Sequence, residues 1–263
     1  MSGGYAELLM YVAPEQVREA NEQWLTRILE LLQATRRDAG GIELLELFRS
    51  PDLLLTQTCG YPLLTQLQGQ VQVVGRPRYE WPDSSAGRHC SVIVGRETDP
   101  RVELADFRGS RGVINDRHSN SGMNLFRHRL TPLQQDGRFF ASVATSGAHQ
   151  QSLRWVREGW ADLASIDSVT FAYLARYAPA EVAGLRIVAR TAISPNLPYI
   201  TALSAGSAGA ERIREAMNLA LQQLPQVSAT LGLQEVLPAS ETDYQVVIGY
   251  QREASAAGYE VLL

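Results

Sequence analysis

Residues 137–171, GRFFASVATSGAHQQSLRWVREGWADLASIDSVTF, contain two strand-loop-helix units in direct succession. An apolar run at 139–144 is followed by the small-residue loop TSGAH and a helical pattern at 150–157. A second apolar run at 161–166 is followed by Asp167 and by another helical pattern. Repeated units of this kind predict a parallel sheet flanked by helices. The stretch therefore indicates an α/β protein.

The same arrangement occurs once before this stretch, and one more strand follows it. The apolar run at 112–115 leads into the loop DRHSNSG and a helical pattern at 121–128. The apolar run at 185–189 closes the block, and the proline-rich SPNLP at 194–198 predicts the exit from it. We therefore expect residues 96–196 to form one lobe of the protein.

The flanking regions alternate between apolar runs and helical patterns in the same way. Strands are predicted at 6–12, 52–58, 71–74 and 90–94, and helices from Pro14 through Leu31, at 211–224 and at 244–254. The chain of 263 residues is long enough for roughly one to two domains. The flanking elements are therefore expected to form a second lobe.

The composition excludes several classes of protein. The formal charge of -4 provides no net attraction to nucleic acid or anionic lipid, so we expect no nucleic-acid partner. All 24 basic residues are arginines, which excludes a Schiff-base lysine and a P-loop lysine. Cys59 and Cys90 are too few for a disulfide scaffold or a four-thiolate zinc site. The sequence is compatible both with one disulfide between them and with two free thiols.

The N-terminal residues MSGGYAELLMYVAPEQ do not have the pattern of a secretion signal. They lack a basic segment followed by an apolar one, and no stretch of the chain approaches the roughly 20 apolar residues of a membrane span. The sequence therefore predicts no signal peptide and no direct membrane insertion. Either a leader has been removed or the protein stays in the cytoplasm.

The loop Ser119-Asn120-Ser121-Gly122 is a candidate anion site. It lies where a predicted strand ends and a helix starts, so the first-turn N–H groups and two hydroxyls would converge on one point. Gly122 would let a ligand approach the backbone closely. The alternative is ordinary capping, in which Ser119 or Ser121 accepts the first-turn N–H bonds.

Two further polar groups follow the next two predicted strands. Ser146 and His149 lie in the loop TSGAH, where His149 could donate to an oxyanion or be satisfied by the backbone. Asp167 could cap the following helix or face an amine or hydroxyl of a ligand. Because the carboxyl ends of parallel strands meet at one edge of a sheet, we expect all three polar loops to lie there.

Signatures of common enzymes are missing from the sequence. It contains no G-x-S-x-G elbow, P-loop, G-x-G-x-x-G fingerprint or HExxH helix, and the four histidines lack metal-ligand spacing. Serine, histidine and aspartate at three strand ends would permit a hydrolytic triad, but no nucleophile-elbow context supports one. We therefore expect no cofactor, no metal and no catalytic residue.

The chain resembles the phosphate/phosphonate-type substrate-binding proteins of ABC transporters, which have the type II periplasmic-binding-protein fold. The resemblance extends over most of the length. It is carried by LLMYVAPE at 8–15, LLTQTCGYPLL at 54–64, SNSG at 119–122, the stretch 137–171 and ISPNLPYIT at 193–201.

The resemblance implies two α/β lobes, each a mostly parallel sheet flanked by helices, with a ligand cleft between them. Lobe one would comprise residues 1–95 and 197–263, and lobe two residues 96–196. In the family, the S-x-S-G loop holds phosphonate or phosphate oxygens. The implied ligand-binding residues are Tyr11, Tyr61, Ser119, Asn120, Ser121, Gly122, Ser146, His149 and Asp167.

The implied function is binding of a small oxyanion, such as phosphate or a phosphonate, and its presentation to an ABC permease. A periplasmic location follows from the resemblance, whereas the missing signal peptide leaves a cytoplasmic one open. Asn120 stands where a threonine is usual, which leaves the ligand open. The alternatives are a cytoplasmic ligand-binding or sensor module, and an enzyme on the same fold that uses His149 or Asp167 on a small carboxylic acid.

Overall fold

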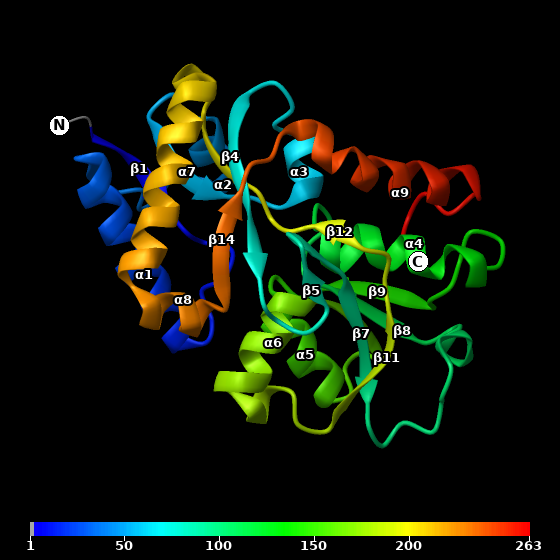
Figure 1. Ribbon diagram of the computed structural model, residues 1–263. Coiled ribbons are helices and arrows are strands. Elements are labelled where there is room, and N and C mark those ends of the chain that lie inside the picture. Colours follow the sequence, from blue (N-terminus) through cyan, green and yellow to red (C-terminus); the bar gives the residue numbers. More distant parts are fainter. Residues whose placement is uncertain (1–2) are drawn as a thin grey trace. The chain divides into compact units, whose positions relative to one another are not determined.

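The computed structural model describes residues 3–263 (Figure 1), which form two compact units. The first unit comprises the chain up to Arg88 together with Pro195–Tyr244. The second comprises His89–Ser194 and Gln245–Leu263. Each unit is built on its own sheet, as the alternating sequence pattern predicts.

The first unit contains a six-stranded sheet of order β14-β4-β13-β3-β1-β2. Its parallel strands are β1 (Gly3–Glu7), β2 (Thr35–Arg37) and β3 (Leu53–Gln57). The antiparallel neighbours are β13 (Tyr199–Ala202), β4 (Val71–Tyr79) and β14 (Leu233–Leu237). The strand predicted at 6–12 corresponds to β1, which begins and ends earlier than predicted. Residues 8–14 have no regular structure and lead into the first helix.

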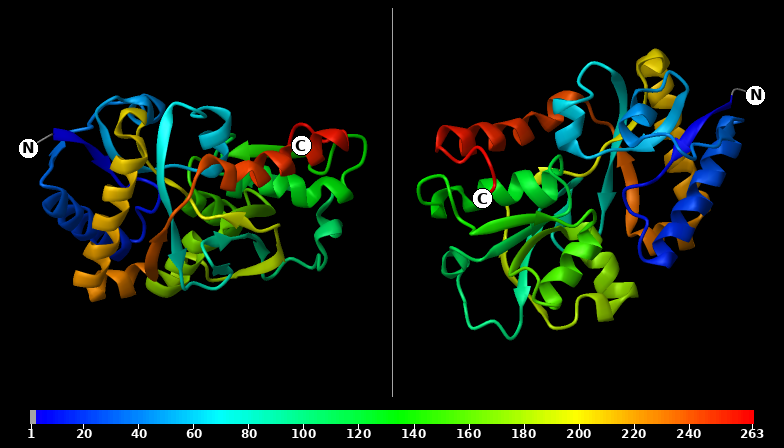
Figure 2. Two further views of the ribbon diagram at one scale, coloured as in Figure 1. Left: turned by 45° about the horizontal axis from the view of Figure 1, so that its top comes forward. Right: turned by 180° about the vertical axis from the view of Figure 1, so that it is seen from behind.

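The helices of the first unit are α1 (Glu15–Leu32), α2 (Leu44–Arg49), α3 (Gly60–Thr65), α7 (Gly206–Gln223) and α8 (Pro225–Leu231), with short 3-10 turns η5 (Leu203–Ala205) and η6 (Glu241–Tyr244). The three- and four-residue spacing of apolar side chains in α1 produces one buried face. Trp24 lies on this face and donates from Nε1 to the Met217 carbonyl at 3.1 Å. This contact joins α1 to α7, which runs beside it (Figure 2).

The second unit contains a five-stranded sheet of order β11-β7-β10-β8-β9. Its strands are β7 (Ser91–Arg96), β8 (Arg111–Ile114), β9 (Ser142–Thr145), β10 (Leu163–Asp167) and β11 (Leu185–Arg190). Strands β9, β8 and β10 are parallel, whereas β7 runs antiparallel to both β10 and β11. Apolar side chains of β7, β8 and β10 pack with those of α5 and α6 into one core.

The helices of the second unit include α4 (Leu125–Leu130), α5 (His149–Arg157), α6 (Ser168–Tyr177), α9 (Gln245–Ala256), the π-helical turn η2 (Asn120–Asn124), and the 3-10 turns η1 (Leu104–Phe107), η3 (Thr131–Leu133) and η4 (Pro179–Glu181). A small sheet of β5 (Ser84–Ser85), β6 (Arg88–His89) and β12 (Ser194–Pro195) contains two of the points where the chain passes between the units.

The units divide the chain differently from the predicted lobes 1–95 plus 197–263 and 96–196. Residues 89–95 belong to the second unit because β7 pairs with β10 and β11. Cys90 is therefore in the second unit while Cys59 is in the first, and no disulfide joins them in the described chain.

The C-terminal segment 245–263 also belongs to the second unit rather than to the predicted first lobe. Helix α9 packs beside α4 (Figures 1 and 2). Tyr259 and Leu262 are buried, and the backbone N–H of Phe139 donates to the Leu263 carbonyl at 2.6 Å. The segment is thus fixed by apolar burial and backbone bonds to the second unit.

Both sheets are mixed rather than mostly parallel as predicted. In the described part of each sheet, two neighbouring strand pairs are parallel and the others antiparallel. Strands β7, β13 and β14 are reversed, and the first two each follow a point where the chain changes unit. An apolar run does not reveal its direction, so the sequence pattern could not predict these reversals.

Candidate functional site

The carboxyl edge of the second unit's sheet brings together several of the predicted polar residues. Strands β8, β9 and β10 are parallel, so the loops that follow them lie at one edge. Ser119 and Ser121 lie at the start of η2, His149 begins α5, and Asp167 ends β10, so all four lie at this edge. Because β7 is antiparallel and pairs Ser91 with Asp167, the start of β7 reaches the same edge.

The serine loop forms the start of a helix that begins with the π-helical turn η2. Ser119 is its N-cap, and its Oγ accepts from the Gly122 N–H at 2.9 Å. This is the predicted capping alternative, realised at Ser119. The first four N–H groups of a helix lack intrahelical carbonyl partners, so the turn still has the polarity that favours an anion.

Ser121 makes the contact that singles out this edge. Its Oγ lies 3.0 Å from Nε2 of His149, although the two residues come from different loops. The Ser121 carbonyl accepts from Ser91 Oγ at 3.0 Å and from Ser165 Oγ at 2.6 Å. These two buried serines tie the loop to β7 and β10, so the Ser121 hydroxyl is fixed next to the histidine.

His149 is electrically neutral near pH 7 in this arrangement. Burial lowers its pKa from 6.5 to about 4, while the charge of Asp167 opposes that shift. Part of the residue is exposed, but Nδ1 has no contact with solvent. A neutral imidazole presents one N–H donor and one acceptor, and it becomes a double donor only on protonation.

Asp167 caps helix α6, which is one of the two roles predicted for it from the sequence. Its Oδ1 accepts from the N–H groups of Val169 at 2.9 Å and Thr170 at 3.1 Å. Its Oδ2 lies 3.1 Å from Nε2 of His89. Burial raises its pKa, but His89 and the backbone donors outweigh burial and leave the pKa below its usual range. A contact between Asp167 and a ligand stays a prediction.

The side chains of Ser146 and Asn120 make contacts within the protein. Ser146 Oγ lies 2.7 Å from Ser152 Oγ and 3.0 Å from the Ala148 carbonyl. Asn120 donates from Nδ2 to Ser194 Oγ at 2.8 Å, and its Oδ1 accepts from Asn124 at 3.1 Å. These bonds hold the two loops in place, and direct contact of either side chain with ligand stays a prediction.

Gly122 permits packing of the loop onto neighbouring side chains. A Cβ at this position would lie 1.8 Å from Oδ1 of Asn115 and 3.2 Å from Cε1 of His149. The predicted reason for glycine here was close approach of a ligand to the backbone. The structure gives a different reason, because side chains of the same unit already occupy this space.

We expect Gly122→Ala to weaken both the fold and ligand binding. The added methyl group must push Asn115 and His149 aside, and overpacking of this kind costs about 1–3 kcal/mol. Thermal unfolding and calorimetric titration would measure the two losses. Gly249→Ala, in α9, is a control for the glycine change alone, since nothing lies within 4 Å of its Cβ position and its backbone is helical. Equal losses in both variants would contradict the packing role of Gly122.

The two predicted tyrosines lie in the first unit. Tyr11 is in the irregular segment between β1 and α1, where its buried ring packs edge-on against Tyr79 with centroids 6.1 Å apart. Tyr61 is in the first turn of α3 and is also buried. Neither tyrosine lies in a strand. Their contact with a ligand stays a prediction.

Sequence reasoning missed His89, Ser91 and Ser165. His89 and Ser91 were assigned to the other lobe because the block was predicted to begin at residue 96. Ser165 was counted only as part of the apolar run at 161–166. A serine inside a fully buried strand is unusual enough to mark a hydrogen bond, and that signal could have revealed Ser91 and Ser165.

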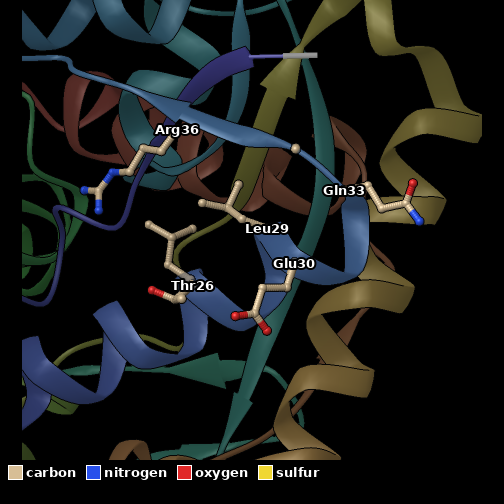
Figure 3. Close-up of a pocket in the computed structure, with 7 residues that line it drawn as sticks. Thr26, Leu29, Glu30, Gln33 and Arg36 are labelled. Carbon is tan, nitrogen blue, oxygen red and sulfur yellow. The ribbon is translucent and has the colours of Figure 1, made fainter. Parts of the chain in front are cut away.

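A hollow in the first unit contains none of the predicted ligand residues (Figure 3). It lies along α1 and β2 and is lined by Leu25, Thr26, Leu29, Glu30, Gln33, Ala34 and Arg36. Its charged residues are paired, Arg36 with Glu7 and Glu22, and Glu30 with Arg27. The hollow is therefore not a second candidate for the oxyanion site.

Within residues 3–263, no group of three or more histidine, cysteine, aspartate or glutamate side chains could hold a metal ion. None of the described helices is long and apolar enough to cross a membrane.

Solved structures of binding proteins share this fold. The protein is similar to a binding-protein component of an ABC phosphonate transporter from Pseudomonas aeruginosa, with TM-score 0.80, 11% identity and coverage of 97% of this chain and 87% of that one. It is also similar to PhnD1 from Prochlorococcus marinus in complex with methylphosphonate, with TM-score 0.73, 12% identity and coverage of 99% of both chains.

A third similar structure is the alkanesulfonate-binding protein SsuA from Xanthomonas axonopodis pv. citri bound to MOPS, with TM-score 0.64, 14% identity and coverage of 98% and 93%. At these identities the likeness establishes the fold. A comparison with curated protein sequences gave no significant match.

The family follows from the sequence itself. The family model described as "ABC transporter, phosphonate, periplasmic substrate-binding protein" matches residues 43–244, which include the serine loop, His149 and Asp167. The match covers more than half of the chain and agrees with the resemblance carried by the stretch 137–171. The chain therefore belongs to the phosphonate-binding family of periplasmic substrate-binding proteins of ABC transporters.

Proposed function

We propose that the second unit binds the oxyanion of a small phosphonate at the carboxyl edge of its sheet, through the serine loop and His149. The observation that carries the proposal is the 3.0 Å contact between Ser121 Oγ and Nε2 of His149 at the start of a helix. Two hydroxyls, an imidazole and a helix N-terminus all favour negatively charged oxygen. The family's ligand class supports the same assignment.

The serine hydroxyls adapt to a ligand because each can both donate and accept. Ser119 Oγ accepts from Gly122, which leaves its O–H to donate. Ser121 Oγ can turn its O–H from His149 toward a phosphonate oxygen. The imidazole then supplies its own N–H or takes up a proton, because a bound dianion favours the charged form.

We further propose that the protein passes its ligand to an ABC permease from a periplasmic location, and that it catalyses no reaction. The family match supports the transport role. The absence of catalysis is supported by the bonds of Asp167 within the protein, where Oδ1 accepts from two backbone N–H groups of α6 and Oδ2 contacts His89.

Calorimetric titration with methylphosphonate, phosphate, methanesulfonate and acetate tests the proposed function. We expect the phosphonate to bind more tightly than acetate, since the fixed donors match three tetrahedral oxygens better than two carboxylate oxygens, and more tightly than methanesulfonate, which carries only one negative charge. At 100 times its Kd, such a ligand stabilises the fold by about 2.7 kcal/mol, which thermal unfolding would show. Binding of acetate alone, or of none of these anions, would contradict the proposal.

A further inference from the structure

His89 is a buried histidine at the same edge that the oxyanion site does not use. It is the first residue of the second unit, and the residue is 2% exposed. Its Nε2 lies 3.1 Å from Oδ2 of Asp167. The lowered pKa of Asp167 keeps the carboxyl ionised, and an ionised carboxylate only accepts hydrogen bonds. The contact with Oδ2 is therefore favourable when Nε2 of His89 carries a hydrogen.

Asp167 is the group that a cationic ligand would seek at this edge. Its Oδ1 already accepts from the N–H groups of Val169 and Thr170, and its Oδ2 lies 3.1 Å from Nε2 of His89. A ligand ammonium would have to displace His89 or lie beside it. If the ammonium displaced His89, the buried imidazole would lose its partner. If the ammonium lay beside His89, two N–H donors would compete for one carboxylate oxygen.

The pair lies close enough to the oxyanion site to affect a ligand there. The charges of both Asp167 and His89 act on His149, whose Nε2 contacts Ser121. Ser91, which bonds to the Ser121 carbonyl, also pairs directly with Asp167 in the sheet. His89, Asp167, His149 and Ser121 thus form one connected cluster.

From this geometry we propose that His89 is a specificity-determining residue, which occupies the Asp167 oxygen that a ligand ammonium would need. The site then takes oxyanions whose organic part is uncharged and discriminates against those that carry an ammonium group. This inference rests on the proposed function, since it concerns the organic part of the same ligand.

Propylphosphonate and 2-aminoethylphosphonate test the inference, because they differ only in a terminal methyl or ammonium group. We expect the wild-type protein to bind propylphosphonate at least about tenfold more tightly. In His89→Ala the Oδ2 atom of Asp167 loses its contact with His89, so the ratio of the two affinities should shift toward 2-aminoethylphosphonate by at least about tenfold.

A second variant covers the case in which His89→Ala does not fold, since that variant leaves a buried carboxylate short of a partner. His89→Gln keeps an N–H donor for Asp167, but it places that donor on a more flexible side chain than the imidazole ring. We expect the same shift in ratio, smaller in size. Adding Asp167→Asn, which keeps the helix cap, should return the ratio toward the wild-type value.

The possible outcomes separate this inference from the proposed function. Equal binding of both phosphonates by the wild-type protein, or unchanged ratios in the folded His89 variants, would overturn the role of His89 while the phosphonate site stands. A shifted ratio that persists with Asp167→Asn would overturn it as well, because the gain would not come from Asp167. Failure of both phosphonates to bind the wild-type protein would instead reject the proposed function.

Discussion

Replacing Ser119 and Ser121 together with alanine is expected to weaken methylphosphonate binding by about 3–6 kcal/mol, because each lost hydrogen bond to a charged group is worth about 1.5–3 kcal/mol. This corresponds to a roughly 10²- to 10⁴-fold increase in Kd. The fold should lose only about 1 kcal/mol, from the N-cap bond of Ser119 to Gly122. Calorimetry and thermal unfolding would separate the two effects.

Ser228→Ala is a matched control for the loss of a serine hydroxyl. Ser228 lies in α8 of the first unit and donates to the Leu233 carbonyl at 2.7 Å. It should cost the fold a comparable amount and leave the Kd unchanged. If the double serine variant bound methylphosphonate as tightly as this control, the serine loop would not be the oxyanion site.

His149→Ala is expected to raise the Kd for methylphosphonate by about 10- to 100-fold, because it removes one hydrogen-bond donor to a charged ligand. It also leaves Ser121 Oγ without the partner seen at 3.0 Å. His149→Gln retains an N–H donor and should recover part of the affinity. Wild-type affinity in His149→Ala would show that His149 only supports the loop.

The pH dependence of binding distinguishes a ligand-contacting His149 from a supporting one. Its pKa is about 4 without ligand, and a bound dianion raises it. Binding therefore takes up a proton between these two pKa values, and affinity falls as the pH rises from the lower to the higher. The ligand's own titration cancels in the ratio of wild-type to His149→Gln association constants. That ratio should fall with rising pH, and a constant ratio would contradict the contact.

The same lowered pKa makes the ligand-free fold sensitive to acid. The unfolded chain binds a proton at His149 near pH 6.5, whereas the folded chain does so only near pH 4. The stability linked to His149 is therefore complete above pH 6.5 and is lost as the pH falls from 6.5 to 4, by about 3 kcal/mol. His149→Gln should lack this loss when unfolding is followed across the same range.

Much of the candidate site could be predicted because it depends on local order along the chain. Strands that end at small polar loops before helices placed Ser119, Ser121 and His149 at one sheet edge, where the structure has them. Two predicted helix caps are also present in the structure, since Ser119 caps η2 and Asp167 caps α6.

The rest depends on contacts between distant segments, which one sequence does not encode visibly. His89 reaches the edge only because β7 enters the sheet in reverse and pairs with β10. Gly122 is explained by Asn115, seven residues earlier, whose side chain folds back against it. The position of α9 depends on its packing with α4. The direction of the strands and the contacts between distant side chains are therefore visible only in the structure.

A crystal structure of the protein grown with methylphosphonate tests the central claim most directly. The account predicts phosphonate oxygens within hydrogen-bond distance of Ser119 Oγ, Ser121 Oγ and the His149 ring, with Asp167 still bonded to His89. A phosphonate bound elsewhere, with the contact between Ser121 and His149 intact and no ligand oxygen beside the serine loop, would contradict it.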